Sequence, residues 1–252
     1  PNVRFAGVAF QDLLTCTQTL QELQIDAYGY EAFDEAQRAA IVSGFANNTT
    51  LRDLEFGSWR EADLAPVLTA LQRHPALQKI HFSAISVCFL RSLSGLEGLV
   101  RSQNSKVKEL VLEQVDTRIV GLHPVLQELG YNTTITKLAI RKSVLSRENV
   151  QQLKAVLRQN TVLQHLILQH SRLSSADLAE IAPVLYRNTS IKTLDLSNNG
   201  LYGMESANLL RELLRRNKTI TSLCLAHNCF GRNTAAIRSI ADGVRSNTTL
   251  QQ

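Results

Sequence analysis

The chain has 252 residues, of which 44% are hydrophobic and 19% charged, the balance of a folded, soluble protein that can bury a sizeable core. No stretch approaches the roughly 18 uncharged apolar residues of a membrane span, and no basic-then-apolar signal segment opens the chain. The net charge of +5 comes from interspersed acids and bases. Without clustered basic residues or aromatic platforms, this charge does not favour nucleic-acid binding.

A six-residue pattern, apolar-x-x-apolar-x-apolar, recurs along the chain. Its copies begin 26 to 31 residues apart, and the alternation in the second half of each copy predicts a short strand. In chain order, the copies are 20–25, 51–56, 77–82, 107–112, 135–140, 163–168, 191–196 and 220–225. A ninth copy begins at Leu250 and stops with the chain, so we expect a fragment of a longer protein.

Between the copies, the apolar residues change to a period near 3.6, which predicts amphipathic helices. This period is clearest over 145–160, 173–188 and 201–217, where Ser174 and Asp177 resemble a capping box. Each unit is thus strand, turn, helix and turn, and no unit covers its own apolar faces. Because stacked units cover each other, we predict an α/β solenoid. Its parallel sheet should line the concave face of a horseshoe arc, with the helices on the convex face.

The predicted organisation is one repeat domain over residues 1–252. Residues 1–19 form an irregular or partial first repeat, residues 20–249 form eight repeats, and residues 250–252 begin the truncated ninth. Two glycines within 88–106 leave open whether that segment forms a regular helix.

An asparagine stands three residues before most copies of the pattern. The residues in this place are Asn48, Asn132, Asn160, Asn188, Asn217 and Asn247, with His74 and Asn104 at or near it in the other two intervals. Several belong to Asn-Thr-Thr or Asn-Thr-Ser, which matches the glycosylation acceptor. We interpret them as structural instead, because a residue that tolerates left-handed backbone is expected where a helix ends before a strand.

The period of about 28, the pattern "LxxLxLxxN" and the "NTTL" junction resemble the ribonuclease-inhibitor-like class of leucine-rich repeats. That class includes the repeat domains of NOD-like immune receptors and of Ran GTPase-activating proteins. The resemblance covers about residues 20–252 and implies an asparagine after each strand that hydrogen-bonds turn backbone. Only Asn199 and Asn228 match, and we expect Trp59 to fill the space of one missing asparagine. The other counterparts are Tyr28, Ile85, Val115, Ser143 and Ser171.

No catalytic constellation of adequate specificity is present, since phosphate-loop, nucleophile-elbow and zinc-protease motifs are all missing. We therefore predict no enzyme activity and no cofactor. His165 and His170 lie five residues apart without a matching ligand pair, so no metal site is predicted. The cysteines are predicted to be buried, reduced thiols of a cytoplasmic protein. They are Cys16, Cys88, Cys224 and Cys229.

Side chains alternate along a strand, so the third and fifth residues of each copy, and the residue after its sixth, should line the concave face. In the middle, Val111, Ala139 and Ile167 lie side by side within a charged border, which resembles the anatomy of a protein interface. The partner-binding candidates are Glu109, Val111, Glu113, Lys137, Ala139, Arg141, Lys142, His165, Ile167 and Gln169. A secondary acidic corner comprises Glu22, Asp26, Asp53 and Glu55. An ordinary solvated sheet is the alternative, because valine and isoleucine favour strands in any case.

These features predict a protein-recognition domain, the ligand-sensing or scaffolding part of a larger intracellular protein. Two alternatives stay open. Family analogy allows a regulator that raises the hydrolysis rate of a Ran-type GTPase, although the acidic tail of that family is missing. The arc could also autoinhibit a neighbouring domain. The identity of the partner and the oligomeric state do not follow from the sequence.

Overall fold

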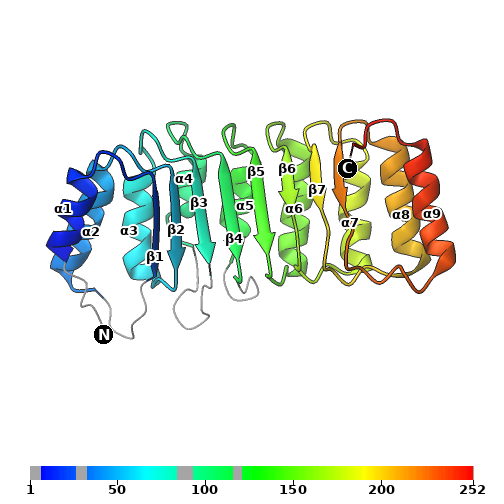
Figure 1. Ribbon diagram of the computed structural model, residues 1–252, viewed down its shortest axis with the longest axis horizontal. Coiled ribbons are helices and arrows are strands. Elements are labelled where there is room, and N and C mark those ends of the chain that lie inside the picture. The colour runs from blue at the N-terminus through cyan, green and yellow to red at the C-terminus, as the bar shows by residue number, and fades with distance from the viewer. Residues whose placement is uncertain (1–6, 27–32, 84–92, 116–120, 252) are drawn as a thin grey trace.

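The protein is described by a computed structural model that covers residues 7–26, 33–83, 93–115 and 121–251. Helices and strands alternate along the chain (Figure 1). The strands are β1 (Glu22–Asp26), β2 (Asp53–Gly57), β3 (Lys79–Ser83), β4 (Glu109–Glu113), β5 (Lys137–Arg141), β6 (His165–Ile167), β7 (Thr193–Asp195) and β8 (Ser222–Cys224). The helices are α1 (Gly7–Cys16), α2 (Glu35–Asn47), α3 (Glu61–Leu71), α4 (Leu96–Arg101), α5 (His123–Leu129), α6 (Arg147–Gln159), α7 (Ser175–Leu185), α8 (Gly203–Arg216) and α9 (Thr234–Ser246).

The eight strands form one parallel sheet in chain order, and the helices cover one of its faces (Figure 1). Each strand pairs with the next so that equivalent residues of the repeated pattern are neighbours, as Leu110 is with Leu138. Helices are wider than the strand spacing of about 4.8 Å, so the uncovered face is the concave one. The predicted α/β repeat solenoid, consistent with a leucine-rich repeat arc, is confirmed. No helix within the described ranges is long and apolar enough to cross a membrane.

One apolar core runs the length of the arc between sheet and helices. In the unit of β5 and α6, Leu138 and Ile140 face Leu153 and Val156, and all four are at most 1% exposed. The N-terminal part of the core is aromatic: the Phe56 ring lies 5.2 to 6.0 Å, between centroids, from the rings of Phe45, Trp59 and Phe82. The change of period predicted from the sequence therefore corresponds to the two layers of each unit.

The first unit and the glycine-containing unit both depart from the regular pattern. In the segment expected to be irregular, α1 forms and packs on α2, with Phe10 and Phe45 in edge contact at 5.8 Å. Within the other, α4 is only six residues long and begins after Gly95, whose φ is +92°. A Cβ at this glycine would lie 2.9 Å from the Ala65 carbonyl oxygen, so both backbone and space require glycine.

The asparagines before the strands act through their side chains, and the predicted left-handed geometry is wrong. Asn160 has φ −77° and ψ 129°, which is extended backbone. Its Nδ2 donates to the carbonyls of Leu129 and Asn132 at 2.7 and 2.9 Å, while its Oδ1 accepts from the amides of Val162 and Leu163. Equivalent bonds to the preceding helix end are made by Asn48, Asn132, Asn188, Asn217 and Asn247. We call this set the asparagine ladder.

The asparagine ladder is interrupted where His74 and Asn104 were expected to continue it. His74 Nδ1 accepts from the Leu77 amide at 3.1 Å, and its Nε2 lies 3.3 Å from Asn48 Oδ1, so the ring replaces an asparagine. Asn104, in contrast, is exposed and makes no such bond within the described ranges. Ser102 Oγ donates to the Gln72 carbonyl at the end of the preceding helix, and Ser105 Oγ accepts from the Val107 amide just before β4, so two serines divide the role of one asparagine.

The turn after each strand is built as the sequence predicts at Asn199 and Trp59. Asn199 Nδ2 donates to the Leu168 carbonyl at 2.8 Å, and Trp59 Nε1 donates to the equivalent Ile25 carbonyl at 3.0 Å. Trp59 is 1% exposed and therefore fills the space of the missing asparagine. The turns within the described ranges share one left-handed residue, with φ between 48° and 56° at Ser58, Gln114, Lys142, His170, Asn198 and His227.

Two further predictions meet a different outcome. Cys16 and Cys229 are exposed and Cys224 is half-buried, so the predicted burial of the thiols is wrong for these free cysteines. The predictions for Cys88, Ile85 and Tyr28 lie outside the described residues.

Candidate protein-binding face

The uncovered face of the sheet presents the predicted columns of side chains. Strand pairing sets Glu109 beside Lys137, and Lys137 beside His165. Val111 lies beside Ala139 in the next column. Because neighbouring strands are about 4.8 Å apart, side chains in one column contact each other directly.

The apolar centre of this face is buried rather than open. Val111, Ala139 and Ile167 form a cluster separate from the main core, and their exposed fractions are 3%, 0% and 9%. Charged residues stand two positions away from Val111 and Ala139 along β4 and β5, and long side chains such as Lys137 and Arg141 can lie over short ones. A partner on this face would therefore meet charged groups, with the apolar side chains beneath them.

Two cross-strand ion pairs hold charges beside this apolar centre. Lys137 Nζ lies 2.9 Å from Glu109 Oε2, and Lys142 Nζ lies 2.7 Å from Glu113 Oε1. The hydrogen bond from Lys142 is the main reason why the pKa of Glu113 is lowered. Half-exposed pairs of this kind add at most about 1 kcal/mol to stability. Their main effect is to fix the position and sign of each charge.

Arg141 differs from these lysines because its side chain makes no hydrogen bond and no ion pair among the described residues. It occupies the end of β5, half-buried, with the paired Lys142 following it. Its Nε is buried without a hydrogen-bond partner. An arginine has five N–H donors in a planar fork, so Arg141 retains the capacity to bind a carboxylate of another molecule.

The remaining middle candidates are neutral. His165 Nδ1 lies 3.0 Å from Thr193 Oγ1, and burial, followed by the charge of Lys137, lowers the His165 pKa. The imidazole is therefore uncharged at neutral pH. Gln169 is half-buried beyond β6, and its carbonyl accepts from the Lys142 amide at 3.0 Å. These two residues continue the face toward β7 with polar atoms.

The acidic corner is only partly open. Glu22 and Asp26 are exposed and form no ion pair within the described ranges, while Asp53 is 3.8 Å from Lys79 Nζ. Glu55 is bound on both carboxylate oxygens, to Ser83 Oγ at 2.6 Å and to His81 Nδ1 at 3.0 Å.

His81 connects the acidic corner with the middle of the face, a role that the sequence did not predict. Its Nδ1 contacts Glu55, and its Nε2 lies 3.7 Å from Glu113 Oε2. The available signal was its register, because His81 stands between Glu55 and Val111 in the fifth-position column. The two predicted regions therefore form one polar surface.

No group of three histidine, cysteine or acidic side chains suited to a metal ion occurs in the part of the chain that the structure describes. His165 is held by Thr193, and the exposed His170 stands in the left-handed turn that follows.

No protein-family model matches the sequence, and comparison with curated proteins gives no significant match. Comparison with solved structures finds 103 similar chains. One is the leiomodin-1 actin-binding site 2, with 24% sequence identity and a TM-score of 0.46 over 52% of this chain and 76% of that chain. A likeness at this level carries no inference about what the present chain binds.

Proposed function

We propose that this chain is a ribonuclease-inhibitor-like leucine-rich repeat domain that binds a protein partner through the uncovered face of its sheet. In this proposal it is a ligand-sensing or scaffolding domain of the cytoplasm and not an enzyme. The observation that carries the proposal is the polar surface from Glu55 to His165, in which cross-strand pairs fix several charges and Arg141 keeps its donors unused.

Fixed charges favour recognition of one partner over others. A partner with complementary charges is steered and oriented by them, and one with like charges is repelled. Arginine is also enriched among the residues that dominate binding energy at protein interfaces. Arg141 lies next to the buried cluster of Val111, Ala139 and Ile167, so a partner carboxylate bound to it would be close to an apolar, poorly hydrated support.

The family and the location are supported by separate observations. The bonds of Asn199 satisfy turn backbone as the family resemblance implies, and the asparagine ladder repeats at a period near 28 residues. Cys16, Cys224 and Cys229 are free thiols, two of them exposed, which favours a reducing compartment.

A charge-swap variant tests the binding face without breaking its ion pair. In Glu109→Lys/Lys137→Glu the pair is kept but its polarity is reversed, so the fold should be preserved while a partner reads opposite charges. Three immobilised proteins capture partners from cell extract, and mass spectrometry quantifies what each one retains. They are the wild-type domain, its charge-swap variant and a control, Arg158→Glu, which changes an exposed residue of α6. We expect at least one protein to be retained by wild type and control and lost by the swap. Equal recovery on all three folded proteins would contradict the proposal.

A further inference from the structure

One edge of the arc carries positive charge in the loops before β2, β3, β4, β7 and β8. The loops that lead from each helix to the next strand contain seven lysines and arginines and not a single aspartate or glutamate. These loops are 17–21, 48–52, 72–78, 102–108, 130–136, 160–164, 186–192, 217–221 and 247–251. We call them the loop edge. Its cations are Arg52, Arg73, Lys106, Lys108, Arg187, Lys192 and Lys218.

The cations of the loop edge are unneutralised, unlike those of the sheet face. Within the described ranges none of the seven takes part in an ion pair, whereas Lys79, Lys137 and Lys142 each lie within 3.8 Å of a carboxylate oxygen. The acids next to Arg52 and Lys108 in sequence, Asp53 and Glu109, belong to the sheet-face column and contact lysines there. The positive charge of the loop edge therefore remains available to an external anion.

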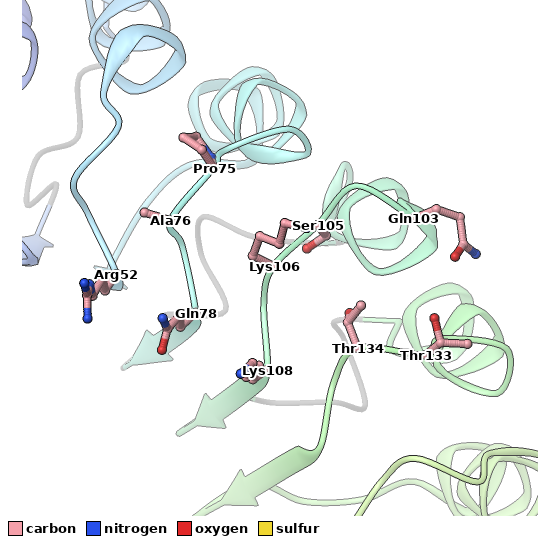
Figure 2. Close-up of a pocket in the computed structure, with 10 residues that line it drawn as sticks. All are labelled: Arg52, Pro75, Ala76, Gln78, Gln103, Ser105, Lys106, Lys108, Thr133 and Thr134. Carbon is pink, nitrogen blue, oxygen red and sulfur yellow. The ribbon is translucent and has the colours of Figure 1, made fainter.

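A hollow of about 610 Å³ lies in this edge, across the loops that precede β2 to β5. Figure 2 shows Arg52, Gln78 and Lys108 at the starts of successive strands, with Lys106 on the loop above Lys108. The hollow coincides with the interruption of the asparagine ladder, since Ser105, which replaces an asparagine, is among its lining residues. The hollow therefore lies where two successive loops lack the ladder asparagine.

We propose that this hollow binds an acidic segment of a polypeptide in extended conformation. Arg52 and Lys108 stand two strands apart, a separation of about 10 Å. Carboxylates three residues apart in an extended chain of the polyproline II type lie on the same side, about 9 Å apart, because that helix has three residues per turn and rises about 3.1 Å per residue. Gln78 lies between the two cations and offers an amide donor to the peptide backbone. The site is distinct from the proposed binding face and does not depend on it.

The lining favours a peptide over a nucleic acid. Its side chains are cations, amides, hydroxyls, one proline and one alanine, and none is an aromatic ring on which a base could stack. Three cations suit a short stretch of carboxylates, and hydroxyl groups such as that of Thr134 add neutral donors.

The test measures binding of a short fluorescein-labelled peptide rich in aspartate and glutamate, by fluorescence anisotropy at low and moderate salt. The variant Lys108→Glu reverses a charge within the hollow. The matched control, Lys192→Glu, reverses the charge at the same position of a repeat outside it. We expect about tenfold weaker binding for Lys108→Glu and an unchanged affinity for Lys192→Glu, with weaker binding at higher salt throughout.

Each alternative outcome overturns the proposal. Equal losses in the two variants would show diffuse attraction to the loop edge instead of a site. Equal affinity for a peptide with asparagine and glutamine in place of the acids would exclude charge recognition. Tighter binding of a single-stranded oligonucleotide, lost in Lys108→Glu, would assign the hollow to nucleic acid. Absence of peptide binding by the folded wild-type protein would exclude the site. Both changed positions are exposed, so the fold should be kept, and thermal unfolding of the two variants checks this.

Discussion

The asparagine ladder allows a quantitative prediction about stability. Its member Asn160 can be compared with Asn104, which occupies the same sequence position but is exposed and forms no equivalent bond within the described ranges. Asn160 is 5% exposed, and its truncation in Asn160→Ala leaves two carbonyls and two amides of the backbone without their partner. An unsatisfied buried group costs about 1–3 kcal/mol, and water reaches some of these groups once the side chain is gone. We expect a loss of about 3 kcal/mol in the free energy of unfolding.

The matched control is Asn104→Ala. Asn104 occupies the same sequence position relative to its strand but is exposed, so its change should cost less than about 0.5 kcal/mol. Urea unfolding followed by far-UV circular dichroism measures both variants, and a loss of 3 kcal/mol lowers the midpoint by roughly 1 M or more. If both variants have the same midpoint, asparagine side chains do not couple the repeats and our account of the ladder is wrong.

Two further predictions concern a buried histidine that stands in for an asparagine and a glycine with left-handed backbone. Burial lowers the pKa of His74, so the unfolded chain takes up a proton more readily than the folded one; stability should fall as pH drops below the ordinary histidine value of about 6.5. Between neutral and mildly acidic pH, the urea midpoint should fall less for His74→Asn than for wild type. An equal fall in both proteins would contradict the role of His74. Gly95→Ala, forced into φ +92° and against a carbonyl, should lower the melting temperature by several degrees, a cost of about 1–3 kcal/mol. The control Gly121→Ala, where a Cβ would meet no atom of the described residues within 4 Å, should leave the melting temperature unchanged, and similar melting of the two variants would refute the argument.

The regular parts of the fold were predictable because each rests on local periodicity. The spacing of apolar residues determines which side chains of β5 and α6 enter the core, and strand register follows from it. The capping box at Ser174 formed as predicted, with the Asp177 amide donating to Ser174 Oγ at 3.2 Å. Trp59 was predictable too, because an absent asparagine left a defined space and a defined carbonyl to satisfy.

The failures concern features that depend on side-chain conformation across repeats. Burial of Ile167 depends on what its neighbours on adjacent strands cover, which sequence spacing does not encode. Asn160 has extended backbone, so its position requires the amide side chain of asparagine and not the tolerance of asparagine for left-handed geometry. The role of His81 required distances to two acids on different strands. Cys16 is exposed at the last residue of α1, a position that the apolar pattern of the repeats does not define.

The interruption of the asparagine ladder has a consequence for how the protein can be observed. His74, Ser102 and Ser105 replace side chains that elsewhere join one helix end to the next strand. Trp59, the single tryptophan of the chain, is packed against aromatic rings on the N-terminal side of this interruption. The larger share of the helical residues, in α5 to α9, lies on its other side (Figure 1). Tryptophan emission therefore reports on the N-terminal stretch of the solenoid, whereas circular dichroism is weighted toward the C-terminal stretch. Comparison of the two unfolding curves measures how cooperatively the repeats unfold.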